Sequence, residues 1–454
     1  MSNHYQVVVI GSGSGGREAA LLAAQKGLQT AVVERDKIGG VTFHSGCYAI
    51  RALQACARQY LSSLKSRRFF NEGDLLKATL YDWIVAQSKV SSRLSESFER
   101  ELRDLNVDLL KGHAEFRDAR TLQVFGERGF RKTITGDNII IATGSRPAFY
   151  GSSIRRLVNS EELLNITKLP RHLAIIGAGY IGCEFASIYR AFGCDVTLIE
   201  AKDRILPGWE PEAGERVAEA LRYRGVRIEL DCPVSYECTI EKADCVCIPG
   251  PGGRDVEADR VLVATGRKPN SKELGLEELG IKDASFLKVD EKMRLSDSGI
   301  YAVGDVNGIS MLDSTAFAQA NVAISNIVGH ESQFDARWIP RCVHTEPAIA
   351  AVGWAETDAA IAGIDSVVIK ESTQLVLDDD RSVIDPEPTF VKVIVDARSL
   401  HLLGCLAVGN HAPVITNTAA IAMRAGLTID KIREIPLAQP SAVDALASTL
   451  RKFG

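Results

Sequence analysis

Two glycine-rich loops carry the residues whose types and spacing could bind a dinucleotide. Each loop follows an apolar run and precedes a stretch rich in helix formers. Glycines at these positions let the backbone turn tightly and approach a pyrophosphate, whose negative charge then lies at the N-terminus of the following helix. The glycines are Gly11, Gly13 and Gly16 in the first loop and Gly177, Gly179 and Gly182 in the second.

An acidic residue follows each loop at the same distance. Glu34 ends the apolar run 30–33 and Glu200 ends the run 196–199, in both cases 18 residues beyond the last glycine. A carboxylate at the end of the second strand of a βαβ unit can accept hydrogen bonds from a ribose diol. A single glycine motif is weak evidence, but this repeated order predicts two dinucleotide-binding units.

The second acidic residue also bears on the choice of nucleotide. Glu200 would repel a 2′-phosphate and accept a hydrogen bond from a 2′-hydroxyl, which favours NADH over NADPH. Lys202 and Arg204 lie close by in the sequence and could partly offset this preference.

The elements that must position these loops include two further apolar runs. Residues 139–142 and 261–264 each precede a Thr-Gly turn, at Gly144 and Gly266, and are predicted to be the closing strands of the two units. A third short run ends in Gly304-Asp305. Asp305 could bind a hydroxyl chain of a ligand or cap the helix that follows.

Length and composition limit the number of domains and the classes of protein to which the chain can belong. The 454 residues (49.2 kDa) suggest two to four domains, and 46% apolar with 24% charged residues indicates a globular chain. A net charge of −5 argues against a nucleic-acid binder, and the chain has no apolar run long enough for a membrane span. The ten cysteines lack CxxC spacing and no signal peptide is evident, so we expect a cytoplasmic protein with reduced thiols.

With these motifs in place, the sequence resembles the class I pyridine-nucleotide–disulfide oxidoreductases, the flavoprotein family of dihydrolipoamide dehydrogenase and mercuric reductase. The resemblance covers essentially the whole chain and includes 338–353, which is similar to the start of the family's dimerisation domain. It implies an α/β fold with two Rossmann-like, doubly wound nucleotide-binding domains plus an α+β C-terminal dimerisation domain. The implied boundaries are 1–150 for the FAD domain, completed by 273–335, then 151–272 for the NAD(P)H domain and 336–454 for the interface domain of a homodimer.

The resemblance also assigns cofactors and contacts. FAD is expected in the first unit and NAD(H) in the second, with NADP(H) the less favoured alternative. Tyr180 takes the position that gates the nicotinamide side of the flavin in the family. The FAD contacts carried over by position are Gly11, Gly13, Gly16, Glu34, Gly40, Arg51, Ala114, Gly144 and Asp305, and the nucleotide contacts are Gly177, Gly179, Tyr180, Gly182, Glu200, Val234 and Gly266.

The first departure from the family lies in its redox centre. Cys47 falls on the second, flavin-proximal cysteine, but the first position is Thr42. A hydroxyl can neither form nor attack a disulfide as a thiolate does, so the internal dithiol relay is expected to be absent. Arg51 takes the place of the family's lysine and could pair with Glu184, or the two could make only generic ion pairs.

The second departure lies near the C-terminus. Gln439 takes the place of the histidine that serves as acid–base in the family, and Asp444 takes the place of its glutamate. A glutamine amide donates and accepts hydrogen bonds but cannot carry a proton near neutral pH. The thiol and its base are therefore both missing, which suggests that dithiol exchange was lost as a unit.

A third departure is Asp313, where family members commonly have alanine. One interpretation is that Asp313 is the N-cap of a helix predicted over 314–328. The other, which follows from the resemblance, is that Asp313 contacts the cofactor region and that its charge lowers the potential of the flavin.

Three further side chains remain as candidates. Cys47 could serve as a charge-transfer donor, cycle through sulfenic acid with peroxide, or be a remnant that only packs there. His44 could be a substitute acid or a plain surface histidine. Cys245 and Cys247 alternate as on a strand, and without partner histidines no metal site is predicted.

The sequence thus predicts an FAD-dependent NAD(P)H oxidoreductase that passes electrons to a small acceptor such as a quinone, dioxygen, peroxide or a second nicotinamide. The alternatives are a dihydrolipoamide dehydrogenase-like or single-cysteine thiol reductase, and a flavoprotein redox sensor or assembly partner that does not turn over.

Overall fold

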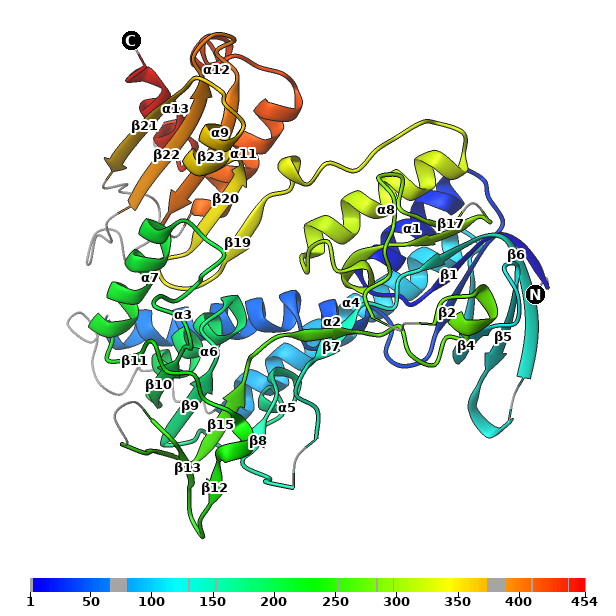
Figure 1. Cartoon of the computed structure of the whole chain (residues 1–454), viewed down its shortest axis with the longest axis horizontal. Coiled ribbons are helices and arrows are strands. Elements are labelled where there is room, and N and C mark those ends of the chain that lie inside the picture. The colour runs from blue at the N-terminus through cyan, green and yellow to red at the C-terminus, as the bar shows by residue number, and fades with distance from the viewer. Residues whose placement is uncertain are drawn as a thin grey trace. The chain divides into compact units, whose positions relative to one another are not determined.

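The computed structural model divides into two compact units (Figure 1). It describes residues 3–65, 80–129, 131–151, 153–250, 254–282, 285–296, 298–373, 389–409, 411–439 and 441–453. The first unit comprises Met1–Leu53, Tyr81–Tyr150 and Gly266–Ala336, and the second comprises Gln54–Leu80, Gly151–Thr265 and Arg337–Gly454.

The first unit is built on a largely parallel sheet in the order β17-β18-β6-β1-β2-β3. Strand β1 lies between β2 and β6, and its Val7, Val8 and Val9 are fully buried because both faces of a central parallel strand are covered. Strand β5 pairs antiparallel with β4 and β6. The strands are β1 (His4–Ile10), β2 (Thr30–Glu34), β3 (Asp108–Lys111), β4 (His113–Phe116), β5 (Thr121–Phe125), β6 (Arg131–Ile141), β7 (Ser145–Pro147), β16 (Arg267–Pro269), β17 (Arg294–Ser296) and β18 (Ile300–Ala302).

Helices α1 and α8 cover this sheet. The alanine-rich α1 packs on β1, β2 and β6 and against α8, where a Cβ on Gly15 would lie 3.5 Å from the Cβ of Ala316. Small residues on both helices therefore let the two backbones come close. The helices are α1 (Ser14–Gln25), α2 (Gly40–His44), the start of α3 (Cys47–Lys65, which belongs to the second unit from Gln54 on), α4 (Leu80–Asp104) and α8 (Asp313–Ile327), with short 3-10 turns η3 (Glu127–Gly129), η6 (Leu276–Leu279) and η7 (Gly304–Asn307).

The second unit repeats this plan with the parallel sheet β11-β10-β9-β15-β8. Helix α6 packs on β9 and β10, α7 on β11, and α5 on β8 and β15. Leu173, Ala174 and Ile175 of the central β9 are fully buried, like the valines of β1. The elements are β8 (Leu157–Val158), α5 (Ser160–Leu163), β9 (His172–Ile176), α6 (Tyr180–Ala191), β10 (Asp195–Ile199), α7 (Pro211–Tyr223), β11 (Arg227–Glu229) and β15 (Arg260–Val263).

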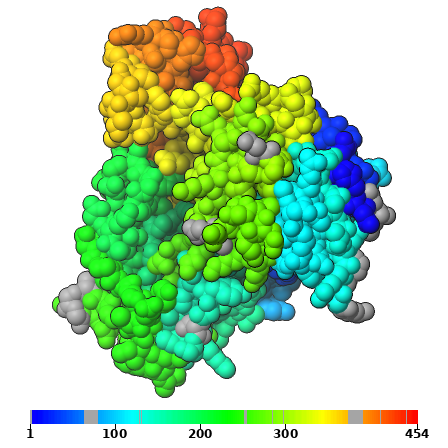
Figure 2. Space-filling view, turned by 45° about the vertical axis from the view of Figure 1, so that its right-hand side comes forward, coloured from blue at the N-terminus to red at the C-terminus, as the bar shows by residue number. Residues whose placement is uncertain are grey.

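Two antiparallel sheets complete the second unit. A small sheet has the order β12-β13-β14, and the C-terminal sheet has the order β19-β20-β23-β22-β21 with α11 and α13 packed on it (Figure 1). Figure 2 shows the outer surface of the C-terminal segment in orange and red. The elements are η4 (Tyr236–Cys238), β12 (Ile240–Glu241), β13 (Val246–Ile248), β14 (Val256–Ala258), η8 (Ala336–Trp338), β19 (Arg341–Val343), β20 (Ile349–Gly353), α9 (Glu356–Ile361), β21 (Ser366–Thr373), β22 (Thr389–Asp396), β23 (Leu402–Val408), α11 (Ala412–Arg424), α12 (Ile429–Arg433) and α13 (Val443–Arg451).

The predicted fold class is confirmed: two Rossmann-like parallel sheets are followed by a C-terminal domain of helices on an antiparallel sheet. None of the helices within the described ranges combines the length and the apolar character that crossing a membrane requires.

Candidate functional site

The first glycine loop joins β1 to α1 and admits no side chain at its first and last glycines. Gly11 has a φ of +99°, and a Cβ there would lie 2.5 Å from the carbonyl oxygen of Ala142. A Cβ on Gly16 would lie 2.0 Å from the carbonyl oxygen of Gly11. The middle glycine, Gly13, differs, because a Cβ there would meet no atom within 4 Å.

Glu34 is held against this loop by its own hydrogen bonds. Its carboxylate is buried, and one oxygen accepts from the backbone N–H of Ser12 (2.8 Å) and from the Ser12 hydroxyl (2.6 Å). The other oxygen accepts from the N–H of Asp36 (2.8 Å). The carboxylate at the end of β2 is therefore fixed beside the loop, as ribose binding in such a unit requires.

The second loop, between β9 and α6, repeats the geometry. Gly177 has a φ of +101°, and a Cβ on Gly182 would lie 1.9 Å from the Gly177 carbonyl oxygen. Glu200 is buried and accepts from the N–H groups of Ala178 (2.7 Å) and Lys202 (3.1 Å). The donors lie at the same positions relative to the glycines and the acid as Ser12 and Asp36 in the first loop.

Both loops fit a dinucleotide. Gly13 and Gly179 are the N-caps of α1 and α6, and neither helix start receives a side-chain cap. A Cβ on either glycine would point into open space, so the uncapped N–H groups can face a pyrophosphate. The fixed carboxylate of Glu200 suits a ribose diol and would repel a 2′-phosphate.

The other residues predicted to contact FAD fall in the first unit. A Cβ on Gly40 would lie 3.3 Å from the Gly13 Cα, so Gly40 packs beside the loop. Asp305, in η7, accepts from the Ser145 hydroxyl (2.5 Å) and lies 3.8 Å from Nε of Arg267. Of the others, Ala114 is buried in β4, Gly144 has a φ of +67° between β6 and β7, and Arg51 is exposed on α3.

The remaining residues predicted to contact the nicotinamide nucleotide differ in their exposure and in the compact unit to which they belong. Tyr180 is the first residue of α6 and is 37% exposed, and Val234 is half-buried. Gly266 belongs to the first compact unit, where its carbonyl accepts from the N–H of Ala148 (2.9 Å). Their contacts with a nucleotide stay predictions.

Position 42 lies in a polar cluster that the sequence did not predict. The Thr42 hydroxyl is 2.7 Å from the Ser14 hydroxyl, and it lies 3.4 Å from Oδ1 of Asp313, which also accepts from Ser14. Burial raises the pKa of the Asp313 carboxyl above its ordinary value, with Thr42 acting in the opposite direction. Ser14 belongs to the first glycine loop, so this cluster adjoins the predicted FAD site.

The N-cap interpretation of Asp313 is wrong. Helix α8 begins at Asp313 itself, Leu312 is its N-cap, and no side chain caps it. The reason is that the Asp313 carboxylate bonds to Ser14 and Thr42 and not to the N–H groups of its own helix. Its negative charge still lies at a helix N-terminus, where the helix dipole favours it.

Cys47 is the first residue of α3 and is exposed. His44, three residues earlier, is half-buried and makes hydrogen bonds through its ring. Its Nε2 lies 2.9 Å from the carbonyl oxygen of Ile38 and 3.1 Å from the hydroxyl of Ser95. These contacts connect α2 to α4, which favours a structural role for the ring.

Glu184 is engaged inside the second unit. One of its carboxylate oxygens accepts from the backbone N–H of His344 (2.7 Å), and the His344 Nδ1 lies 3.4 Å from the Cys342 sulfur. Sequence reasoning missed this thiol–imidazole pair, although Cys-x-His on a strand places both side chains on one face. Pairing of Glu184 with Arg51 stays a prediction.

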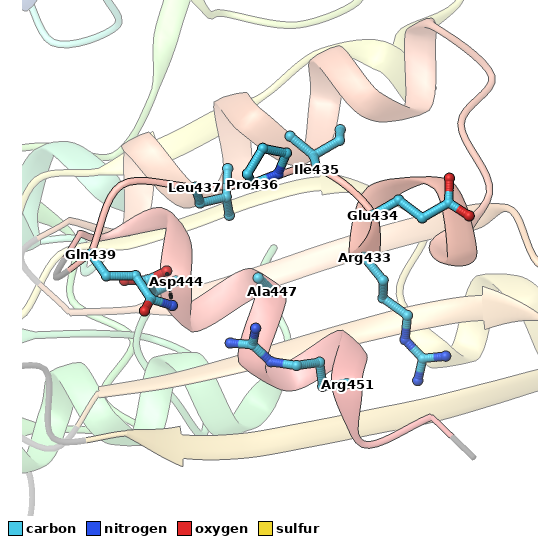
Figure 3. A pocket seen from close by; sticks show the side chains of 9 residues that line it. All are labelled: Arg433, Glu434, Ile435, Pro436, Leu437, Gln439, Asp444, Ala447 and Arg451. Carbon is cyan, nitrogen blue, oxygen red and sulfur yellow. Dashed lines mark hydrogen bonds between the residues drawn. The ribbon is translucent and has the colours of Figure 1, made fainter.

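The two predicted C-terminal residues are brought together. The Gln439 amide donates to Oδ1 of Asp444 (3.2 Å), while the Ser441 N–H donates to its other oxygen (3.0 Å). They lie at one end of a cavity of about 290 Å³ whose other end carries Arg433 and Arg451 (Figure 3). Position 439 therefore offers a hydrogen-bonding amide, and its replacement of a family base stays a prediction.

Comparison with known proteins decides the family. The family model described as "Pyridine nucleotide-disulphide oxidoreductase" matches residues 5–325, and the model of that family's dimerisation domain matches 339–449. The chain belongs to the class I pyridine-nucleotide–disulfide oxidoreductases. This oxidoreductase family uses FAD and NAD(H) and acts on NADH and sulfur groups, so the predicted cofactors and enzyme class are confirmed.

Individual members of the family are similar over nearly the whole chain. The dihydrolipoyl dehydrogenase of Staphylococcus aureus is 33% identical over 94% of this chain and 91% of its own. That of Geobacillus stearothermophilus is 32% identical with the same coverage. Among solved structures, LpdA of Mycobacterium tuberculosis has a TM-score of 0.89 at 25% identity over 99% of both chains. The copper(II) complex of the HOCl-induced flavoprotein disulfide reductase RclA of Escherichia coli has a TM-score of 0.86 at 26% identity over 100% of both.

Proposed function

We propose that this oxidoreductase passes electrons from NADH through FAD to a small acceptor that is not a disulfide: a quinone, dioxygen, peroxide or a second nicotinamide. The observation that carries the proposal is the pair of hydrogen bonds made by the Thr42 hydroxyl. They join this side chain to Ser14 and Asp313 in a polar cluster. A threonine here supplies no sulfur with which Cys47 could form a disulfide.

The environment of Gln439 supports the same conclusion. A thiol substrate must lose its proton to a base before it can exchange with a disulfide. Gln439 instead donates its amide N–H to Asp444 and has no proton to exchange near neutral pH. Loss of the base and loss of the thiol affect the same half-reaction, whereas both dinucleotide loops keep their full geometry.

The chain's own residues have distinct proposed roles. Bound FAD would supply the centre that accepts a hydride from the nicotinamide and delivers electrons to the acceptor. Gly13 and Gly179 would let the two pyrophosphates reach the helix N-termini, while Glu34 and Glu200 would orient the riboses. Tyr180 would gate access of the nicotinamide, and Asp313 would add negative charge beside the first loop.

The proposal also includes an oligomeric state and a cellular location. The match of residues 339–449 to the dimerisation domain supports a homodimer, and we expect the chain to act in the cytoplasm. Domain boundaries at 150, 272 and 335 remain part of this proposal.

A second candidate function is a single-cysteine thiol reductase. It is favoured by the exposed position of Cys47 at the first residue of α3, where a thiol is open to reagents. Substitution of Cys47 separates the two functions, because the first needs no sulfur.

The proposal is tested by restoring the missing chemistry. Wild type, Thr42→Cys, Gln439→His and the double variant would be assayed with NADH and either lipoamide or a benzoquinone. Wild type and Cys47→Ser should reduce the quinone at similar rates, and both should reduce lipoamide poorly. The double variant should gain at least about 100-fold in lipoamide reduction, the lower range of a general base's contribution.

The control is the quinone reaction, which should change little in the variants that retain FAD. Wild type that reduces lipoamide as fast as quinone would overturn the proposal. A chain that is reduced once by NADH and then turns over with no acceptor would indicate a redox sensor instead.

A further inference from the structure

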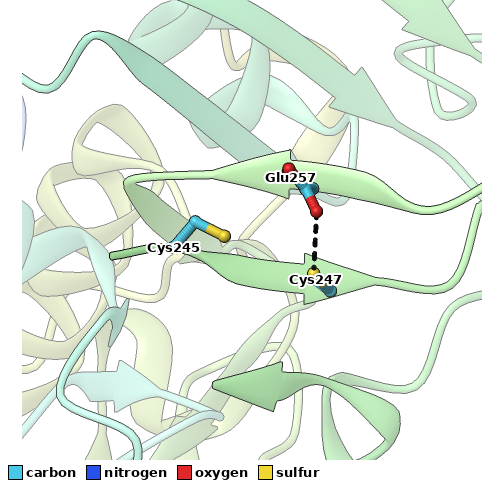
Figure 4. A group of neighbouring side chains, drawn as sticks. All are labelled: Cys245, Cys247 and Glu257. Atoms are coloured by element: carbon cyan, nitrogen blue, oxygen red, sulfur yellow. Dashed lines mark hydrogen bonds between the residues drawn. The ribbon is translucent and has the colours of Figure 1, made fainter. Parts of the chain in front are cut away.

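The small sheet of the second unit places two thiols and a carboxylate on one face. Cys245 immediately precedes β13 and Cys247 lies within it, and their sulfur atoms come within 4.8 Å of each other. Glu257 of β14 pairs directly with Cys247 in the antiparallel register and shares that face (Figure 4). The absence of partner histidines led to the prediction of no metal site, but the hairpin brings Glu257 beside the two cysteines as a third possible ligand.

The three possible ligand atoms lie close together, and the one sulfur–oxygen distance matches a tetrahedral metal site. The two sulfur atoms and a Glu257 oxygen all lie within 4.8 Å of one another. The Cys247 sulfur is 3.5 Å from Oε1 of Glu257. Metal–sulfur and metal–oxygen bonds of about 2.3 and 2.1 Å at a tetrahedral angle place sulfur and oxygen about 3.6 Å apart.

Burial and charge suit a cation at this face. Cys247 is 2% exposed, Cys245 is half-buried and Glu257 is open to solvent, so an ion could enter from the Glu257 side. A positive group already stands there, because Nζ of Lys242 donates to Oε1 of Glu257 (2.7 Å). Lys242 is exposed and its long side chain can swing away when another cation binds.

We propose that Cys245, Cys247 and Glu257 bind a thiophilic divalent cation, with Zn²⁺ as the best fit, and leave one coordination position to water. Two thiolates with a carboxylate form a ligand set that zinc accepts. Binding breaks two S–H bonds, forms two S–Zn bonds and releases two protons to solvent. The ion would fasten β13 to β14 at the surface of the second unit, where the turn between β12 and β13 forms an outer tip (Figure 1).

The test is zinc binding to the full, flavin-loaded chain. Protein treated with a chelator and a thiol reductant would be titrated with Zn²⁺ in competition with a chromogenic zinc indicator, and proton release would be measured by calorimetry in two buffers. Wild type should bind one Zn²⁺ at this site and release close to two protons.

The variants are chosen to keep the fold. Cys245→Ser and Glu257→Gln alter half-buried and exposed side chains, and each should weaken zinc binding at least about tenfold. Cys238→Ser is the matched control, because Cys238 is an exposed thiol in η4 that lies seven residues before Cys245.

Cys238→Ser should bind zinc like wild type. The proposal is overturned if wild type binds no Zn²⁺ at micromolar concentrations, or if Cys245→Ser binds as tightly as Cys238→Ser. Neither readout depends on turnover, so the result is independent of the proposed electron acceptor.

Discussion

The two glycine loops hold their acidic residues in the same way but differ in what surrounds them. In each loop the N–H after the first glycine donates to a carboxylate 22 residues later, at 2.8 Å to Glu34 and 2.7 Å to Glu200. In each, a Cβ on the last glycine would lie at most 2.0 Å from the first glycine's carbonyl oxygen. The glycine loop and its hydrogen-bonded glutamate therefore have the same geometry in both units.

The surroundings of the first loop are more polar. The Ser12 hydroxyl bonds to Glu34 and accepts from the N–H of Gly39 (3.1 Å), and Ser14 reaches Asp313 and Thr42. The corresponding residues of the second loop are Ala178 and Tyr180, which carry no such cluster of short hydroxyls. The comparison teaches that the same glycine-loop geometry can be surrounded by different side chains, because those side chains come from elements distant in the sequence.

The largest expected effect comes from filling the closed glycines. Gly16→Ala and Gly182→Ala would each put a Cβ about 2 Å from a backbone carbonyl, so the helix must move away from the strand. Overpacking against backbone should lower the free energy of unfolding by at least about 3 kcal/mol. Urea unfolding of the two variants would measure this loss.

Gly13→Ala and Gly179→Ala are the matched controls, since their Cβ atoms would meet nothing within 4 Å and their φ values of −66° and −71° suit alanine. Both should fold, but Gly13→Ala should lose FAD and Gly179→Ala should lose NADH affinity. If Gly179→Ala binds NADH normally, the pyrophosphate does not approach α6 as proposed.

The next effect concerns nucleotide choice. Ala178 and Lys202 donate to different oxygens of Glu200, so Glu200→Gln keeps an acceptor for only one of these N–H groups. The substitution also removes the charge that would repel a 2′-phosphate. The preference for NADH over NADPH, measured as the ratio of kcat/KM values, should fall about tenfold, equivalent to about 1.4 kcal/mol.

Glu34→Gln sharpens this comparison, because it makes the same change in the other loop. It should weaken retention of FAD and leave the NADH to NADPH ratio unchanged. A shift of that ratio in Glu34→Gln and none in Glu200→Gln would show that the two loops had been assigned the wrong way round.

The smallest effect is expected from Asp313→Asn. Burial raises the pKa of Asp313 above its ordinary 3.8, so its protonated form favours folding and this contribution is lost as pH rises through the raised value. The variant has no charge to bury, and its stability relative to wild type should increase between pH 4 and pH 8. Thermal unfolding across this range would measure the difference, and a constant difference would contradict the role assigned to burial.

Removal of the same charge should also act on bound FAD. We expect the reduction potential of the flavin in Asp313→Asn to rise by less than about 30 mV, which would be about 1.4 kcal/mol for a two-electron couple. Equilibration with a reference dye would measure the change. An unchanged potential would restrict Asp313 to its bonds with Ser14 and Thr42.

Local sequence patterns predicted both strand–loop–helix segments that contain the glycine loops. The spacing of Gly16 from Glu34 and of Gly182 from Glu200 sufficed, because a strand, a tight turn and a helix are set by neighbouring residues. The helix predicted over 314–328 is observed over Asp313–Ile327.

The side-chain contacts around the glycine loops and in the β13–β14 hairpin could not be predicted from local sequence patterns. Ser14 and Asp313 are 299 positions apart, and the capping signal at Asp313 was misleading because a tertiary hydrogen bond replaced the local one. Glu257 meets Cys247 only through the register of a hairpin. Such partners are determined by packing between elements, which residue types alone do not encode.

The most direct test of the central claim is anaerobic titration of the flavin-loaded chain with NADH, followed by its visible spectrum. Thr42 leaves no dithiol to store a second electron pair, so the flavin absorbance should bleach fully with one equivalent of NADH per flavin. Uptake of a second equivalent, or a long-wavelength band before bleaching, would contradict the account and assign a redox role to Cys47.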